Sequence, residues 1–297
     1  MRIRILRNRI TPMSFSIEKY LKEKRIAIES TLNRLLHSPK KYPPIIHQAM
    51  RYAVFGKGKR LRPILLIAAA EACGGKASDV LPAACAIEMI HTYSLIHDDL
   101  PAIDDDDYRR GKLSCHKKFG EAMAILAGDA LLTRAFEVLS QMRFPKDKVL
   151  QAKVIAQVTQ AIGTEGMLGG QVEDIQSLSS PTQGQREKRL SYIHSHKTAA
   201  LINVALKVGA ILAGASRGEL KALDKYGRNF GLAFQITDDI LDKKEKKELT
   251  YLRIYGLKTS REKVKRLIKS AKISLKGFKK RGELLKKLID YFVESRI

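Results

Sequence analysis

The chain has 297 residues, of which 44% are hydrophobic and none is Trp, and its formal net charge is +24. This hydrophobic content is sufficient for a sizeable core and excludes a disordered chain, while the longest uninterrupted apolar run, residues 64–70, is far too short to cross a bilayer. We therefore expect a soluble protein with one folded domain, because no Pro-, Ser- or Gly-rich linker divides the sequence.

The cysteines and the charge distribution indicate the cellular location and the kind of partner to expect. Cys73, Cys85 and Cys115 have no metal-binding spacing, and the first two lie in apolar helical sequence, where a thiol usually fills the core. A reducing, cytoplasmic location fits this pattern. Residues 243–297 hold nineteen Lys and Arg against six Asp and Glu. Since no nucleic-acid-binding motif accompanies this excess, we expect no nucleic-acid partner and at most peripheral contact with a membrane.

The first sixteen residues are basic and acid-free, and they lack the apolar core of a secretory signal. We interpret residues 1–16 as a loose leader or an over-extended start, with Met13 as the alternative initiator, and expect the folded domain to be 17–297. From 17 to 36 apolar residues recur with helical period. Three prolines between residues 39 and 44 end this helix, and a second helix covers 45–55.

A turn rich in glycine and cations, Gly56-Lys-Gly-Lys-Arg-Leu-Arg-Pro63, opens the third helix. Glycine backbone N–H groups, the positive end of the helix dipole and the side chains of Lys59, Arg60 and Arg62 combine into an anion site. By itself such a turn is usually only solvated. Gly74 and Gly75 then end the helix, and an apolar helix from residue 80 leads into the most acidic stretch of the chain.

Two clusters of aspartates interrupt apolar helices. Six aspartates lie between residues 98 and 107, and Asp238, Asp239 and Asp242 form the second cluster, with spacings of three and four that put their carboxylates on one helix face. Clustered carboxylates take up protons unless a cation neutralises them. Because all candidate ligands are oxygen atoms, a hard ion such as Mg²⁺ is favoured over Zn²⁺. An acidic run is more often a solvated surface, but that explains one cluster and not two.

Three further segments have interpretable patterns. Residues 119–138 predict a helix that is apolar almost all round, for which we expect burial and a packing role. Residues 166–174 contain three glycines in a helical setting, which destabilise a helix and imply the close approach of another element or a ligand. A Lys197-Thr198 pair, uninformative by itself, precedes the apolar run 199–213.

Several of these motifs resemble those of the trans-isoprenyl diphosphate synthase (polyprenyl synthetase) family, most closely the bacterial farnesyl diphosphate synthases. Asp98-Asp99-Leu-Pro-Ala-Ile-Asp104 is similar to the family's first aspartate-rich motif, and Asp238-Asp239-Ile-Leu-Asp242 is similar to the second. The glycine turn resembles Gly-Gly-Lys-Arg-Leu-Arg-Pro, with Lys57 as a departure. The resemblance covers residues 40–242 and implies an all-α, single-domain isoprenoid-synthase helical bundle around a central cavity, and a homodimer.

The resemblance also implies a role for each matching residue. Two or three Mg²⁺ ions, with Mn²⁺ as an alternative, would be held by Asp98, Asp99, Asp104, Asp238 and Asp242. Isopentenyl diphosphate would be bound by Lys59, Arg62, His91 and Arg110, and the allylic diphosphate by Arg109 and Lys197. Thr198, Phe234 and Gln235 would line the pocket of the allylic cation, and Gln171 and Asp174 would act through water or metal. The residues expected to be catalytic are Asp98, Asp99, Lys197 and Asp238.

The implied reaction is the head-to-tail condensation of isopentenyl diphosphate with a C5 or C10 allylic diphosphate. Tyr93 lies five residues before Asp98, about 7 Å along a helix, and with Ser94 it is the candidate determinant of product length. A ring at this depth would form a floor and limit the product to C15 farnesyl diphosphate. Geranylgeranyl diphosphate, C20, is the close alternative.

The sequence departs from the family pattern after Asp242. Only residues 243–249 precede Thr250-Tyr251, so the family's loop lysine is missing at its usual spacing, and its candidate substitutes are Lys243, Lys244, Lys246 and Lys247. The short loop favours the alternative of a low-activity or non-catalytic prenyltransferase subunit, which the two intact clusters oppose. A class I terpene cyclase is the other alternative. It has no use for the second diphosphate pocket that the glycine turn provides.

Overall fold

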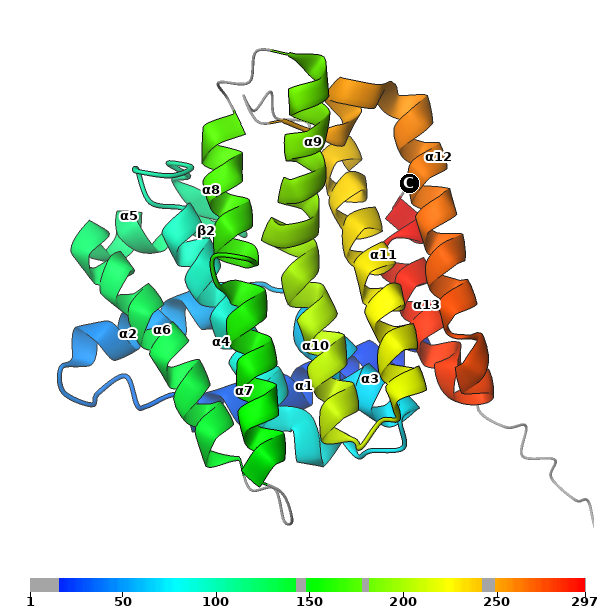
Figure 1. Ribbon diagram of the computed structural model, residues 1–297. Coiled ribbons are helices and arrows are strands. Elements are labelled where there is room, and N and C mark those ends of the chain that lie inside the picture. Colours follow the sequence, from blue (N-terminus) through cyan, green and yellow to red (C-terminus); the bar gives the residue numbers. More distant parts are fainter. Residues whose placement is uncertain (1–15, 143–147, 178–181, 242–248, 297) are drawn as a thin grey trace, which may run out of the picture.

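A computed structural model of the chain describes residues 16–142, 148–177, 182–241 and 249–296, and these segments are almost entirely helical (Figure 1). A two-residue hairpin, β1 (Tyr108–Arg109) with β2 (Lys112–Leu113), is the sheet structure found in them. The predicted all-α fold is therefore confirmed. The α-helices of the first half are α1 (Ile17–Leu35), α2 (Pro44–Val54), α3 (Leu61–Ala72), α4 (Ala77–Asp98), α5 (Cys115–Phe119) and α6 (Glu121–Gln141).

The second half of the chain continues in the same way. Its helices are α7 (Lys148–Ile162), α8 (Met167–Ser177), α9 (Gln183–Ile193), the π-helix η1 (His194–Thr198), α10 (Ala199–Leu212), α11 (Arg217–Leu241), α12 (Tyr251–Ser274), the 3₁₀-helix η2 (Lys276–Gly282), α13 (Glu283–Phe292) and the 3₁₀-helix η3 (Glu294–Arg296). None of the helices in the described segments is long and apolar enough for a membrane span.

The predicted start and stop signals act where the sequence places them. The Ser16 side chain caps α1 by accepting a hydrogen bond from the backbone of Lys19, and α1 ends before Pro39. Pro44 occupies the first turn of α2, where the missing N–H has no helical acceptor to lose. Together these signals fix the first two helices within one residue of the sequence prediction.

The core is organised around α10, which is buried along almost its whole length and lies in the middle of the bundle (Figure 1). Helices α3, α4, α7 and α11 surround it. Gly209 allows the contact with α3, because a Cβ atom at this position would lie 2.0 Å from the carbonyl oxygen of Leu66. The two helices that carry the aspartate clusters, α4 and α11, are thus both fixed against the same central helix.

The expectation that residues 119–138 are buried all round is wrong for part of the helix. One side of α6 packs into the core through residues such as Ala127 and Leu131, but Ile125 and Leu126 are 44% and 49% exposed. Hydrophobicity all round a helix predicts burial without identifying what covers each side. In the single chain, the side of α6 that carries Ile125 and Leu126 is exposed to solvent.

The last helices return to the beginning of the domain. Helix α13 packs against α1 and α3, and η3 follows it, so the C-terminal segment lies beside α11 and α12 (Figure 1). This path brings Arg296 from the strongly basic end of the sequence to the second aspartate cluster.

Candidate active site

A cavity of about 420 Å³ collects nine of the predicted substrate and metal residues. Its walls come from the start of α3, the second half of α4, the β1 hairpin, the end of η1 and the second half of α11, five places that are far apart in the sequence. The predicted residues that line it are Lys59, Arg62, His91, Arg109, Arg110, Thr198, Phe234, Gln235 and Asp238.

Two guanidinium groups converge on one imidazole at the α3 side of this cavity. Arg62 Nη1 lies 3.1 Å and Arg110 Nη2 lies 3.3 Å from Nε2 of His91. Since an arginine can only donate, Nε2 of His91 accepts from both. Burial, reinforced by the neighbouring arginines, holds the pKa of His91 well below its usual value, so the ring is neutral. The arrangement aims two fixed positive charges and Lys59 into the cavity, as a diphosphate site requires.

The first aspartate cluster is folded back on itself at the end of α4. The backbone N–H of Asp104 donates to the carbonyl of Asp98 at 2.9 Å, which brings the two side chains together. Burial, with a smaller contribution from Asp104, raises the pKa of Asp98 to about 6. Asp99 is different, because it is buried and accepts a 2.7 Å hydrogen bond from Nε of Arg109. Asp98 and Asp104 therefore form a carboxylate pair, while Asp99 holds Arg109.

The lysine of the Lys-Thr pair bridges to the first cluster. In η1, Nζ of Lys197 donates to Asp174 of α8 at 2.5 Å. Burial acts to lower the pKa of Lys197, but Asp174 and Asp98 outweigh it and raise this pKa. Lys197 is thus charged and shared between α8 and the acidic end of α4.

The glycine-rich segment makes this placement sterically feasible. A Cβ atom at Gly170 would lie 2.2 Å from the backbone nitrogen of Lys197, so a larger residue would push α8 away from η1. The prediction that these glycines mark a close approach is confirmed. The Nε2 atom of Gln171, next in sequence, is buried with no hydrogen-bond partner within the described segments. A water or a bound ligand would satisfy it.

The two described aspartates of the second cluster have different surroundings: Asp238 lines the cavity, and Asp239 is bonded within the protein core. Asp238 lines the cavity and accepts a 2.7 Å hydrogen bond from Arg296. Asp239 is buried and points to the fold, where it accepts from the backbone N–H of Tyr251 at 2.8 Å and lies 3.2 Å from His194. The third aspartate of the motif, Asp242, and the lysines at 243, 244, 246 and 247 lie outside the described residues.

A short chain of contacts joins the two clusters. Lys197 interacts with Asp98, and its neighbour Thr198 donates to Gln235 at 2.7 Å, one helical turn before Asp238. Arg109, the partner of Asp99, and Asp238 line the same cavity. The second cluster, about 140 residues from the first in the sequence, therefore contributes Asp238 to the cavity directly. The first cluster reaches it through Arg109, since Asp98, Asp99 and Asp104 do not themselves line it.

The donor set fits divalent cations. Asp98, Asp104 and Asp238 supply hard oxygen ligands of the kind that Mg²⁺ takes. Cationic groups already accompany them: Lys197 lies near Asp98, and the guanidinium of Arg296 binds Asp238. In addition, burial raises the pKa values of both Asp98 and Asp238, a cost that a bound cation would remove.

Of the residues predicted for the hydrocarbon pocket and for product length, Phe234 lines the cavity and Tyr93 and Ser94 do not. The Phe234 ring lines the cavity, and the guanidinium of Arg296 stands over it at 5.3 Å from the ring centre, so this ring face already accommodates a cation. Tyr93 is buried below Asp98 and packs edge-on against His97. Ser94 is half-buried, and its hydroxyl donates to the carbonyl of His91.

The structure corrects the role of one residue of the site, Arg60, and reveals another, Arg296, that the sequence did not single out. Arg60 was grouped with the anion-binding cations, but it is buried, its φ angle is 53°, and its Nη1 donates to buried Glu88 at 2.7 Å. It therefore anchors the turn that presents Lys59. Arg296 was missed entirely, since nothing local distinguishes it from the other cations of the basic C-terminal region.

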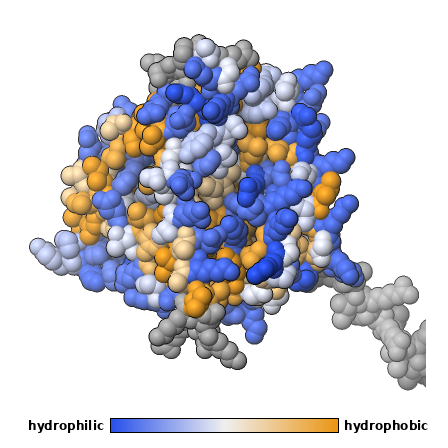
Figure 2. Space-filling view, viewed as in Figure 1, coloured by the Kyte–Doolittle hydropathy of each residue, from blue (hydrophilic) through white to orange (hydrophobic). Residues whose placement is uncertain are grey.

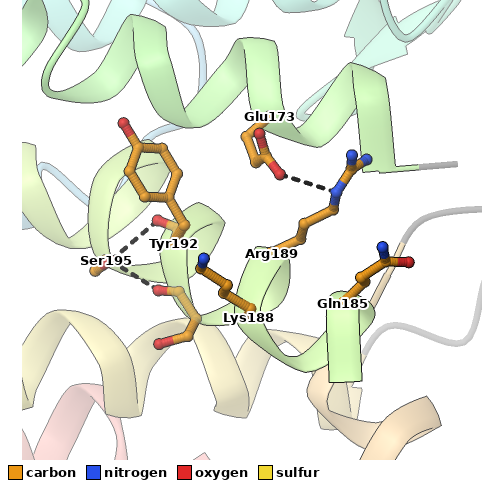
Figure 3. A pocket seen from close by; sticks show the side chains of 7 residues that line it. Glu173, Gln185, Lys188, Arg189, Tyr192 and Ser195 are labelled. Atoms are coloured by element: carbon orange, nitrogen blue, oxygen red, sulfur yellow. Dashed lines mark hydrogen bonds and ion pairs between the residues drawn. The ribbon is translucent and has the colours of Figure 1, made fainter. Parts of the chain in front are cut away.

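A larger hollow of about 720 Å³ lies between α8 and α9 (Figure 3). Two of the charged residues that line it, Glu173 and Arg189, pair with each other at 3.2 Å. The Ser195 hydroxyl donates to the carbonyl of Ser191. Of the side chains drawn there, Glu173, Arg189 and Ser195 are thus engaged within the protein. The described residues that line this hollow do not include converging arginines or an aspartate, both of which line the smaller cavity.

Comparison with known proteins agrees with the geometry. The polyprenyl synthetase family model matches residues 43–272. The chain is 43% identical, over 96% of its length and 85% of the relative's, to a dimethylallyltranstransferase of Fischerella ambigua, and 45% identical, over 90% and 76%, to the large subunit 1 of a heterodimeric chloroplastic geranylgeranyl pyrophosphate synthase of Arabidopsis thaliana.

Solved structures give the same result. The apo crystal structure of an FPP/GFPP synthase from Zymomonas mobilis superimposes with a TM-score of 0.86 at 35% identity, covering 93% of this chain and 98% of that one. The family match spans both aspartate clusters and the glycine turn. The chain belongs to the polyprenyl synthetase family, the trans-isoprenyl diphosphate synthases, and is a prenyltransferase with their all-α fold.

Proposed function

We propose that the protein condenses isopentenyl diphosphate with a C5 or C10 allylic diphosphate and releases farnesyl diphosphate. The single observation that carries this proposal is one cavity lined by the His91 arginine pair, by Asp238 of the second aspartate cluster, and by Arg109, which is hydrogen-bonded to Asp99 of the first cluster. One end of the cavity suits a diphosphate bound by fixed cations, and the other end suits a diphosphate bound by metal ions.

The protein's own groups divide the work. Lys59, Arg62 and Arg110 bind the diphosphate of isopentenyl diphosphate, with neutral His91 fixing the two arginines in place. Arg109 and Lys197, each held by a carboxylate, bind the allylic diphosphate. Mg²⁺ held by Asp98, Asp104 and Asp238 would neutralise that diphosphate as it leaves. Asp99 positions Arg109 in this scheme, and its sequence-based assignment as a metal ligand stays a prediction.

Carbon–carbon bond formation takes place beside Phe234. The allylic C–O bond breaks, the diphosphate leaves with the electron pair, and the double bond of isopentenyl diphosphate attacks the allylic cation. The ring face of Phe234 stabilises the positive charge, and Thr198 and Gln235, which are hydrogen-bonded to each other, line the same cavity. The departed diphosphate takes the proton that restores the double bond, so no side chain serves as the base.

The length of the product depends on which side chain closes the pocket below Asp98. Tyr93 is buried under Asp98 and supports a C15 product, because a tail growing down α4 from the metal site would meet its ring. Geranylgeranyl diphosphate is the second candidate, supported by the names of several relatives, among them a geranylgeranyl diphosphate synthase of Cyanophora paradoxa that is 41% identical over 94% of this chain.

We infer that the functional unit is a homodimer. Ile125 and Leu126 expose apolar surface on α6, a helix that is otherwise part of the core. A second copy packed against α6 would bury this surface. A non-identical partner is the alternative, because one relative is named as the large subunit of a heterodimeric synthase. Sedimentation of the purified chain alone distinguishes the two.

Incubation of the purified chain with Mg²⁺, isopentenyl diphosphate and each of the C5, C10 and C15 allylic diphosphates tests the proposal. Farnesyl diphosphate from the C5 and C10 starters, and no extension of the C15 starter, is the expected result. Extension of C15 establishes the geranylgeranyl alternative. No turnover by a chain that still binds Mg²⁺ and pyrophosphate points to a subunit that requires a catalytic partner.

A further inference from the structure

The outward side of α12 carries a row of cations. Lys258, Arg261, Lys265 and Lys269 follow one another at intervals of three, four and four residues, which places them on one side of a helix, and all four are exposed. We call these four residues the basic face. The opposite side of α12 is buried against the domain through Ser260, Val264, Leu267, Ile268 and Ala271.

The acidic groups of the described segments leave this row without ion-pair partners. In the described part of the chain, no carboxylate forms an ion pair with any residue of the basic face, whereas Lys272, one row away, is held by Asp290 and Glu294. Residues 251–280 contain eleven Lys and Arg and a single acid, Glu262. Fixed on a rigid helix, this uncompensated charge produces a strong positive potential over one surface of the molecule.

Apolar side chains accompany the cations. Ile273 lies four residues after Lys269 on the same side of α12, and Leu257 directly precedes Lys258; each is 44% exposed. Figure 2 likewise shows, along the edge where α12 lies, a mostly hydrophilic surface with a few hydrophobic residues in it. Cations mixed with exposed aliphatic groups suit the boundary between lipid headgroups and acyl chains.

The composition of the basic face argues against a nucleic acid. Non-specific binding of single strands uses aromatic side chains on which bases stack, and the basic face and its two apolar neighbours contain no aromatic residue. Ile273 and Leu257 have no role against a phosphate backbone. They have one against a bilayer, where each buried apolar group adds to the electrostatic attraction.

We propose that the basic face of α12, with Ile273 and Leu257, is the site at which this protein docks on an anionic lipid bilayer. The contact is peripheral and reversible, because it consists of four cations and two aliphatic side chains. It is independent of the prenyl transfer chemistry, since it uses no residue of the cavity.

The test is flotation of the full-length chain with vesicles of phosphatidylcholine alone or with 40% phosphatidylglycerol. We expect binding to the anionic vesicles only, weakened by salt. The variant K258Q/R261Q/K265Q/K269Q should partition at least about tenfold less, since each cation near an anionic surface contributes about a fivefold factor. Ile273→Ser should reduce partitioning severalfold without any change of charge.

The matched control removes the same charge elsewhere. K19Q/K40Q/K41Q/K153Q neutralises four exposed cations scattered over α1, the segment before α2, and α7, and it should retain most of the binding. Equal losses in both quadruple variants would show that total charge is responsible and would overturn the proposal. The proposal would also be overturned if the α12 variant bound the vesicles as strongly as the wild type does, even if that variant no longer bound single-stranded DNA. Circular dichroism and thermal melting establish that every variant is folded.

Discussion

Nη2 of Arg296 donates a 2.7 Å hydrogen bond to Oδ1 of Asp238, joining the C-terminal turn to the second aspartate cluster 58 residues earlier. The same guanidinium lies over the ring of Phe234. A cation of the protein therefore occupies the carboxylate and the ring face that the proposed reaction assigns to a metal ion and to a carbocation. Arg296 should compete with the metal ion for Asp238.

Arg296→Met should strengthen metal binding. The substitution keeps an apolar side chain over Phe234 and removes the charge from Asp238, so the dissociation constant for Mn²⁺ in the absence of substrate should fall about threefold to tenfold, as expected for the loss of a partly exposed ion pair. Electron paramagnetic resonance measures the free Mn²⁺. Arg189→Met, which breaks an ion pair outside the cavity, is the matched control and should change nothing. Unchanged or weaker Mn²⁺ binding in Arg296→Met would contradict the competition.

Asp98→Asn should stabilise the metal-free protein in a pH-dependent way. The pKa of Asp98 is raised from 3.8 to about 6, so the folded state binds a proton more tightly than the unfolded state. Its contribution to stability is therefore most favourable below pH 4, and it is lost as the pH rises through 6. Asn imitates the protonated form, so its advantage should grow between pH 4 and 7 to at most about 3 kcal/mol.

Urea unfolding at pH 4 and at pH 7, with and without Mg²⁺, measures this effect. Mg²⁺ should stabilise the wild type more than Asp98→Asn, and the variant should lose prenyl transfer. A stability difference between the two proteins that is the same at both pH values would show that Asp98 is not a destabilising carboxylate.

Glu88→Gln should be strongly destabilising. Arg60 and Glu88 form an ion pair in which both side chains are almost completely buried. Removal of Glu88 leaves the buried guanidinium with only the more exposed Glu29, at 3.6 Å, as a charged partner, at a cost of about 3 kcal/mol. The double variant Arg60→Met with Glu88→Gln should recover part of this loss, because neither buried charge of the pair then remains. Denaturant unfolding gives both values. If the two single losses simply add in the double variant, the residues do not act as a pair.

Gly170→Ala should disturb the allylic diphosphate site. The added Cβ would meet the backbone of Lys197 at 2.2 Å, and neither helix can yield without moving the other. We expect an increase of about tenfold or more in the KM for the allylic diphosphate, with a smaller change in the KM for isopentenyl diphosphate. Gly184→Ala, in α9 where the added atom meets nothing within 4 Å, is the control and should have wild-type kinetics.

Tyr93→Ala should lengthen the product. Removal of the buried ring opens space below Asp98, so chromatography of the reaction products should show C20 and longer chains in place of C15. Tyr93→Phe keeps the ring and should keep the product length. An unchanged product in Tyr93→Ala would place the floor of the pocket at another residue.

The sequence by itself determined the class of fold and the chemistry of the site. Helical periodicity and the prolines before α2 are local signals, so α1 and α2 begin and end close to the predicted residues. The two aspartate clusters, the glycine turn and the Lys197-Thr198 pair carry their chemistry in short stretches of sequence. Such stretches can be read without knowing what lies opposite them.

Only the tertiary structure decided which partner each group has. In the sequence, Asp99 and Asp239 cannot be distinguished from Asp98 and Asp238. In the structure, however, Asp99 accepts from Arg109, and Asp239 lies beside buried His194. Ion pairing and burial depend on groups brought together by helix packing from distant parts of the chain. Local sequence therefore specifies which side chains can bind a metal or a phosphate, and packing specifies which of them face the cavity.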